Sequence, residues 1–277
     1  MESKKRGVWI WVVLVAGLGL ACCCALAVAG AIGVPAIVRS VSGEDTGWPV
    51  VRIDRLGPEM SERTEQTFEV DSGPTLEVSN FAGAVTIRAG GEDTIRVVAT
   101  RMARRARDLE DIRVEMSGEG SRVKVKTSFA GVSGSNPRVI LQITVPAETD
   151  LDLRTSAGAI EVYGVQGDLE ADAAAGGITI QGASGSARLT AGAGGIDYEG
   201  QPSGVCTFHV GAGGITLRLR ADADVRVDLT AGLGGVSSEL PVDGSVGVRS
   251  IHGTIGTGEK GSISATAGVG GIDLVRR

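Results

Sequence analysis

The fold of this 277-residue chain is decided by residues Ala175–Leu217, which read AGGITIQGASGSARLTAGAGGIDYEGQPSGVCTFHVGAGGITL. Within this stretch one pattern occurs three times: a small residue, two glycines, an isoleucine, a polar residue and an apolar residue. The copies are Ala175–Ile180, Ala193–Tyr198 and Ala212–Leu217. The alternation after the glycines has the period of two that is typical of a half-buried β-strand.

Weaker copies of the pattern extend outward in both directions. The first glycines of all the copies, strong and weak, are Gly83, Gly158, Gly176, Gly194, Gly213, Gly234, Gly253 and Gly270. From Gly158 onward the spacings between these glycines are 18, 18, 19, 21, 19 and 17 residues. A near-constant period of this size indicates stacked structural repeats.

Apolar residues flank each of these glycines at fixed distances. The positions seven and five before the glycine are Leu76/Val78, Leu151/Leu153, Leu169/Ala171, Ala187/Leu189, Cys206/Phe208, Val227/Leu229, Val246/Val248 and Ile263/Ala265. Each repeat is therefore predicted to be a strand, a glycine corner, a second strand and a second turn such as Gly182–Gly185. Since one repeat cannot bury its apolar face alone, the repeats must stack, and glycine supplies the positive φ or the room that a stacked corner needs.

These features predict an all-β fold for residues 151–277. We expect a β-solenoid (β-helix-like) stack of roughly 18-residue glycine-cornered repeats, whose Ile and Val rows share one interior. A twisted β-sandwich is the alternative.

The N-terminal part predicts a membrane anchor. Residues 7–38 carry no charge, and Lys4, Lys5 and Arg6 in the tail of residues 1–6 precede them. Because about 20 apolar residues cross a bilayer, we expect one transmembrane helix with its N-terminus inside and the C-terminal domain outside the cytoplasmic membrane. A cleaved signal peptide is the competing interpretation, but its apolar core is usually only about 7 to 15 residues long. A lipoprotein cleaved before Cys22 fits less well. Residues 39–66, rich in Gly, Pro, Ser and charge, are predicted to be a spacer.

Residues 67–150 hold the first copy of the pattern but otherwise depart from the period. Thr94–Ala99, Arg122–Lys126 and Val139–Val145 are predicted strands, and Arg104–Asp111 is a predicted short helix. We expect a wider β-element with this helix to cap the membrane-proximal end of the stack. The last repeat runs directly into Arg276 and Arg277, so we expect an uncapped far end suited to self-association.

Composition restricts the function. Beyond Val38 the chain has 24 Lys and Arg against 32 Asp and Glu, a net charge of −8, which disfavours nucleic acid as a partner. Cys206 is the one cysteine outside the apolar N-terminal run, so no disulfide can form within the repeats. Only 3% of the residues are aromatic, and of the seven aromatic residues past the anchor Tyr198 and Phe208 fall at inward positions, so a lectin groove is not supported.

No catalytic, cofactor-binding or metal-ligating residue is predicted. His209 and His252 are the only histidines, too few for a zinc site, and Cys206 occupies a core position. The glycine strings lack the Gly-Lys-Ser/Thr of phosphate loops and the regular Asp of calcium-binding turns.

Charged positions predict solvated faces. The run Arg101, Arg104, Arg105 and Arg107 could contact anionic lipid, but neighbouring Asp108, Glu110 and Asp111 favour a neutralised helix face. The outward acids Asp152, Glu161, Glu170 and Asp197 are scattered among other polar residues, unlike the clustered acids of β-helical polysaccharide enzymes.

The anchor, the spacer and the run of AGGIxI-like corners together resemble the bacterial "putative adhesin" domain family, whose function is unknown. The resemblance covers about residues 67–275 and implies a membrane-linked all-β repeat protein of the bacterial envelope. A second likeness, to polymerising bactofilin scaffolds, conflicts with the exported topology. We expect a non-catalytic adhesin-like binding module or envelope scaffold and stress accessory, with a polysaccharide lyase or hydrolase as the alternative. Its expected partners are the membrane, an envelope protein, a surface polymer or further copies of itself.

Overall fold

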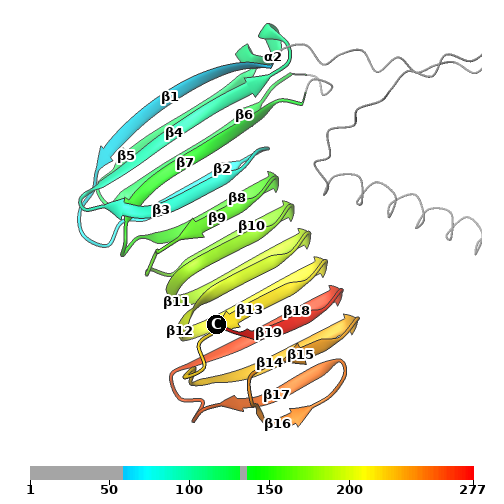
Figure 1. Ribbon diagram of the computed structural model, residues 1–277. Helices are drawn as coiled ribbons and strands as arrows, with labels where there is room; N and C mark the ends of the chain where they lie inside the picture. Colours follow the sequence, from blue (N-terminus) through cyan, green and yellow to red (C-terminus); the bar gives the residue numbers. More distant parts are fainter. Residues whose placement is uncertain (1–58, 132–135) are drawn as a thin grey trace, which may run out of the picture. The chain divides into compact units, whose positions relative to one another are not determined.

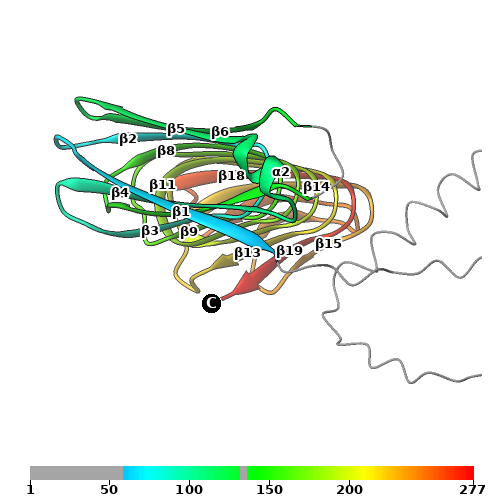
Figure 2. The same cartoon turned by 90° about the horizontal axis from the view of Figure 1, so that it is seen from above.

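A computed structural model describes residues 59–131 and 136–277. Within these ranges the chain forms nineteen strands and one short helix, so the predicted all-β class is confirmed. All the strands belong to one hydrogen-bonded sheet, which curls round a single core and almost closes on itself (Figure 1, Figure 2). Two faces result, one built from the strands before the glycine corners and the other from the strands after them.

The elements follow one another as β1 (Met60–Glu69), β2 (Thr75–Asn80), β3 (Val85–Gly91), β4 (Thr94–Ala103), α2 (Ala106–Glu110), β5 (Ile112–Glu119), β6 (Arg122–Phe129), β7 (Arg138–Pro146), β8 (Asp150–Ala157), β9 (Ile160–Tyr163), β10 (Leu169–Ala175), β11 (Ile178–Ala193), β12 (Ile196–Ala212), β13 (Ile215–Leu219), β14 (Val225–Leu233), β15 (Val236–Ser238), β16 (Asp243–Val246), β17 (Ser250–Ile255), β18 (Gly261–Val269) and β19 (Ile272–Arg276). The predicted second turn at Gly182–Gly185 is a bent stretch inside β11, where the register shifts twice.

Successive repeats pair in parallel and in register. On the first face Leu151 lies beside Leu169, and Leu169 beside Ala187. On the second face Ile178 lies between Ile160 and Ile196. Equivalent positions of neighbouring repeats therefore face each other at the inter-strand spacing of about 4.8 Å.

The glycine corners are what allow this close stacking. Gly176 and Gly194 both have φ of +145°, a conformation that other residues rarely adopt. Gly176 N donates a hydrogen bond to Ala193 O of the next repeat (2.8 Å), and Gly194 N donates to Ala212 O (2.9 Å). A Cβ on either glycine would overlap with the carbonyl oxygen of the glycine in the preceding repeat. Both predicted reasons for the glycines, positive φ and room, are confirmed here.

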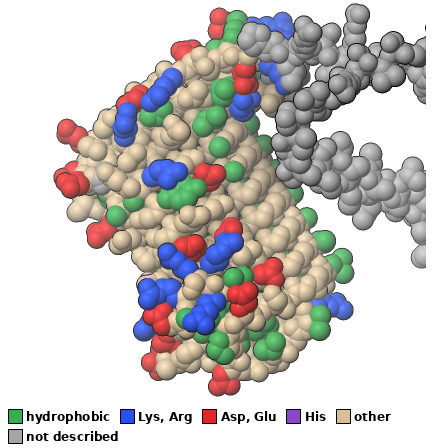
Figure 3. Space-filling model, in the orientation of Figure 1, with side chains coloured by type: hydrophobic (Ala, Val, Ile, Leu, Met, Phe, Trp, Pro, Cys, Tyr) green, Lys and Arg blue, Asp and Glu red, His purple; other side chains and the backbone are tan. Residues whose placement is uncertain are grey.

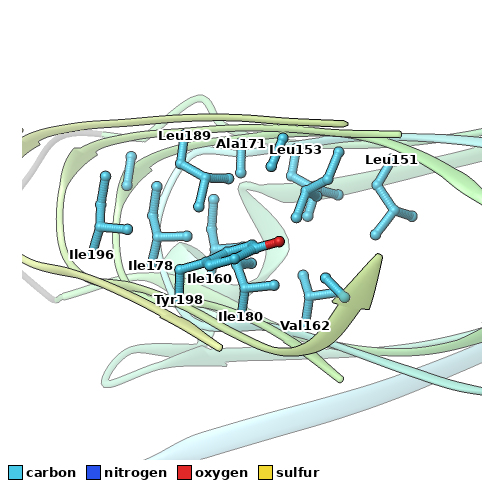
Figure 4. Packing of buried hydrophobic residues seen from close by; sticks show 14 of the residues in the cluster. Leu151, Leu153, Ile160, Val162, Ala171, Ile178, Ile180, Leu189, Ile196 and Tyr198 are labelled. Atoms are coloured by element: carbon cyan, nitrogen blue, oxygen red, sulfur yellow. The ribbon is translucent and has the colours of Figure 1, made fainter. Parts of the chain in front are cut away.

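The interior is a narrow apolar core between the two faces. The isoleucine rows Ile160, Ile178, Ile196, Ile215 and Ile272 are at most 2% exposed, so the predicted common interior is confirmed. In Figure 4 the side chains of both faces point toward one another across this space. Each such buried side chain contributes about 1.5–3 kcal/mol of transfer free energy.

The repeats do not stack in the order of the sequence. The last one, β18 and β19, lies between β12/β13 and β14/β15 and pairs in parallel with both (Figure 1). The prediction that the final repeat forms an uncapped far end is therefore wrong. At the other end β2 and β3 lie in the same way between β6/β7 and β8/β9.

An antiparallel pair closes the far end instead. β17 runs antiparallel to β14, and β16 runs antiparallel to β17. His252–Ile255 is part of β17, so its assignment as a glycine corner was wrong, and Gly253 is not among the glycines with positive φ. Val246 and Val248, which were assigned to the core, are 63% and 81% exposed. Their spacing matches the repeat pattern by coincidence, because β16 is the outermost strand of this cap and is exposed at every residue.

The near end is capped by the predicted β-element. The expected strands lie within β4, β6 and β7, and the expected helix is shortened to α2, which leads into β5. β1 takes in residues 60–66 of the segment assigned to the spacer, pairing antiparallel with β4 along its length. No apolar pattern marks β1, because it is an edge strand that is exposed at nearly every residue.

The proposed anchor at residues 7–38 lies outside the described residues. Among the residues that are described, no helix has the length and apolar character needed to span a bilayer.

A glycine substitution tests the corner geometry. We expect Gly176→Ala to lower the free energy of unfolding by about 3 kcal/mol or more, because it combines a disfavoured φ with a backbone clash. The neighbouring Gly177→Ala is the matched control, since its Cβ would sit 3.6 Å from Gly195 O, an ordinary contact. Urea unfolding of the two variants, followed by circular dichroism, makes the comparison, and equal losses would contradict the account of the corner.

Engineered disulfides test the order of the repeats. With Cys22, Cys23 and Cys24 replaced by serine, Thr207→Cys/Ser264→Cys should oxidise readily, because these outward positions are direct neighbours on β12 and β18. Thr207→Cys/Asp228→Cys should not, since two strand spacings of about 4.8 Å exceed the roughly 7 Å limit for a disulfide. Mass spectrometry of the digested proteins reads out both. A link in the second pair alone would mean that the repeats stack in sequence order.

Candidate binding surface and turn pocket

The two histidines lie apart on the outer surface. His209 is exposed on β12, and His252 is exposed on β17, where its Nδ1 lies 3.0 Å from Asp228 Oδ1. In the described residues no group of three or more His, Cys, Asp or Glu side chains is placed to hold a metal ion.

Cys206 and Tyr198 are core residues, as the pattern predicts. Both are fully buried, and the rings of Tyr198 and Phe208 have centroids 5.0 Å apart. Burial raises the pKa of the Cys206 thiol and, by a larger amount, the pKa of the Tyr198 phenol. Neither group lies in an open cleft, so neither is available as a nucleophile.

The basic run lies at the capped end. Arg104, Arg105 and Arg107 are exposed around α2. Arg101 is half-buried on β4, donates to Ile112 O (2.9 Å) and pairs with Glu62 (2.7 Å). Arg107 lies 3.9 Å from the buried carboxylate of Asp108, which supports the predicted neutralisation in part.

Outward charged residues of both signs lie side by side on the first face. We term this row the charged ladder, and it consists of Glu77, Asp152, Arg154, Glu170, Asp172 and Arg188. Arg154 is its centre, with Asp152 at 3.1 Å, Asp172 at 3.7 Å and Glu170 at 3.8 Å. A hydrogen bond from Lys124 holds the pKa of Glu77 below its usual range, with help from the charges of Arg122 and Arg154. Two of the four acids that looked scattered in the sequence, Asp152 and Glu170, thus converge with Asp172 on one guanidinium, because parallel in-register pairing puts them side by side.

Glu161 and Asp197 lie on the opposite face, where basic and acidic side chains are interspersed around β13 and β19 (Figure 3). Asp197 pairs with Arg218 and raises the pKa of that guanidinium. Glu161 accepts hydrogen bonds from Tyr163 (3.3 Å) and Thr86 (3.4 Å). These acids are therefore satisfied within their own face and are separate from the charged ladder.

A pocket that no residue pattern predicted opens among the turns on the edge away from the glycine corners. We term it the turn pocket, and its volume is about 290 Å³. Its polar lining comprises Ser184, Gln201, Ser203, Arg220, Asp222, Asp224 and Lys260, and Pro202, Ala223 and Val225 supply apolar wall. The stretches that line it belong to four different repeats, which only stacking brings together.

Hydrogen bonds fix the polar groups of the turn pocket. Arg220 donates from Nε and Nη2 to both carboxylate oxygens of Asp222 (2.9 and 3.2 Å), and this pairing lowers the pKa of Asp222. With its amide oriented to satisfy its neighbours, Gln201 also accepts from Arg220 Nε (3.1 Å). Asp224 accepts from Thr257 Oγ1 (2.9 Å) and from Gly258 N, which tie down the turn before β18. Although desolvation acts to raise the pKa of Asp224, these hydrogen bonds outweigh it and lower the pKa.

The sequence did contain one signal for the turn pocket. The spacing from Gly213 to Gly234 is 21 residues, the longest in the regular region, and the extra residues fall in the turn that carries Arg220 and Asp224. This turn is long because it steps over the inserted β18/β19 repeat to reach β14.

Comparisons with known proteins give the following. No family model and no curated protein matches the chain. A solved "putative cell adhesion protein" from Clostridium sporogenes is 16% identical with a TM-score of 0.41, covering 78% of this chain and 100% of that one. "Putative adhesin" structures from Bacteroides fragilis (12%, TM-score 0.30) and Parabacteroides distasonis (10%, TM-score 0.26) each cover 77% of this chain and 97% of their own. These names agree with the family that the sequence resembles, while likeness at this level says nothing about function.

The raised pKa of Cys206 leads to a reactivity prediction. With Cys22, Cys23 and Cys24 replaced by serine, we expect Cys206 to react with Ellman's reagent only as fast as the protein unfolds, whereas an exposed Thr207→Cys should react at once. A thiol with a raised folded-state pKa stabilises the fold fully below its unfolded pKa of about 8.5, and this stability is lost as the pH rises above that value. Equal labelling rates for the two thiols would contradict the burial of Cys206.

Proposed function

We propose that this chain is a non-catalytic, adhesin-like binding module held at the bacterial cytoplasmic membrane with its repeats outside. The charged ladder is the observation that carries the proposal. It presents both signs of charge on a hydrogen-bonded sheet, where neighbouring strands fix the position of each side chain. Such a surface suits recognition of a charged partner by complementarity, which gives specificity more than raw affinity.

The non-catalytic part of the proposal is supported by the direction of the pKa shifts. A general acid working near neutral pH needs a carboxyl group with a raised pKa. In the described residues, the carboxyl groups with a resolved shift all have lowered pKa values; they are Glu65, Glu77, Asp222 and Asp224. Carboxylates held in the charged form favour binding over proton transfer.

The architecture is included in the proposal. We infer that the repeats form a β-solenoid, which the parallel in-register pairing of β8, β10, β11 and β12 supports. We further infer that residues 7–38 anchor the chain, because 32 uncharged residues are ample to cross a bilayer. From the basic residues before the anchor we infer that the repeats lie on the extracytoplasmic side. There they could reach an envelope protein or a surface polymer.

A sedimentation assay tests the proposed function. The full chain is reconstituted into fluorescent liposomes, mixed with purified bacterial sacculi that retain their attached polymers, and the bound fluorescence is measured. Wild type should sediment with the sacculi. Arg154→Glu/Arg188→Glu should lower the apparent affinity by at least about fivefold, because it reverses the sign of the two ladder cations.

One control variant completes this assay. Arg249→Glu, in the exposed loop between β16 and β17, changes the net charge without touching the charged ladder and should bind like wild type. Failure of wild type to sediment, or equal loss in both variants, would sink the proposal. Release of soluble saccharide fragments by the protein would show that the non-catalytic part is wrong.

A further inference from the structure

The turn pocket owes its existence to the displaced last repeat. Because β18 lies between β12 and β14, the turn from β13 to β14 must span two strand spacings, and Lys260 enters β18 beside that turn. Bulged residues of β11 and β12 close the opposite wall, where Ser184 pairs with Gln201. In repeat proteins, insertions into the period commonly map to the binding face.

The charged side chains of the turn pocket differ in how many of their polar atoms are already hydrogen-bonded within the protein. Asp222 is occupied by both donors of Arg220, and Asp224 is occupied by the turn at Thr257 and Gly258. Arg220 Nη1 lies 3.3 Å from the oxygen of Gln201 and keeps a second N–H for a ligand, and Lys260 retains its exposed ammonium. The donors left to meet a ligand are therefore the second Nη1 N–H of Arg220, the ammonium of Lys260 and the hydroxyls of Ser184 and Ser203, while both aspartates keep their charge.

From this arrangement we propose that the turn pocket binds a carboxylated sugar unit of the uronic acid class. Arg220 and Lys260 take the carboxylate, in keeping with the preference of guanidinium for planar oxyanions. Ser184, Ser203 and Gln201 supply hydrogen bonds to ring hydroxyls. Pro202, Ala223 and Val225 offer an apolar wall to the C–H face of the ring.

A neutral sugar is the weaker fit. Recognition of neutral sugars relies on an aromatic platform, and no Phe, Tyr or Trp side chain lines this pocket. The binding free energy that stacking on an aromatic ring would give must therefore come from the charge of the ligand. Because this inference rests on the turn pocket alone, it stands or falls separately from the charged ladder and from the assay above.

The test is titration calorimetry of the full chain in nanodiscs with glucuronate, glucose and inorganic sulfate. Glucuronate should bind with measurable heat, and glucose and sulfate each at least about tenfold more weakly, since one lacks the carboxylate and the other the hydroxyls. Arg220→Ala and Lys260→Ala should each weaken glucuronate binding by about tenfold, and raising the salt concentration should weaken it further.

Asp222→Asn tests whether removing a negative charge raises or lowers the affinity for glucuronate. It removes a competing negative charge while keeping the shape of the side chain, so it should strengthen glucuronate binding by a few fold. Arg249→Ala, distant from the turn pocket, is the matched control and should leave affinity unchanged. Absence of glucuronate binding, equal binding of glucose or sulfate, weaker binding by Asp222→Asn, or an equal loss in Arg249→Ala would each overturn the proposal. Circular dichroism of every variant confirms that a loss is not unfolding.

Discussion

The structure depends on the contact between the glycine corners of neighbouring repeats. At five corners a backbone N–H donates to the next repeat of the stack, and the space a Cβ would need is occupied by the carbonyl oxygen of the glycine in the preceding one; the corner glycines are Gly158, Gly176, Gly194, Gly213 and Gly270. Glycine alone satisfies both conditions, so the corners lock the strand spacing on both faces. With the strand spacing fixed, the isoleucine and leucine rows of neighbouring repeats lie in register. A core with few aromatic residues is sufficient because the two faces lie close together.

A parallel stack of this kind would leave open edges at both ends, and such edges invite pairing with other chains. In this chain both ends carry antiparallel strands. At the far end the chain skips one position, builds the antiparallel cap and returns to fill the gap, whereas at the near end it builds the cap onto β2 and β3 and then resumes the stack on their other side. As a result β2 and β3 lie between the near-end cap and β8/β9, and β18 and β19 lie between β12/β13 and β14/β15. The long turn that this step requires at the far end also creates the turn pocket, so the closure of the stack and this concavity have the same origin.

Outside the core, in-register stacking turns single charges into arrays. Acids spaced about one repeat apart in sequence become neighbours around Arg154, and each such exposed pair is worth at most about 1 kcal/mol to stability. Their value lies in the fixed pattern of charge that they present. We therefore propose two kinds of recognition on this surface: the extended charged ladder for a large partner and the turn pocket for a small anionic unit.

The sequence by itself determined the all-β class, the glycine corners, the buried rows and the core position of Cys206, because each depends on local alternation and on a spacing that recurs. Tertiary structure decided the rest. The position of β18/β19 between earlier repeats could not be read from the chain, because parallel pairing satisfies the same pattern with either neighbour. Val246 and Val248 matched the core spacing yet lie exposed, and β1 had no apolar pattern yet forms a strand, because pairing partners and edges are settled in space. The turn pocket joins four repeats, so its residues acquire a common role only once the stack has formed.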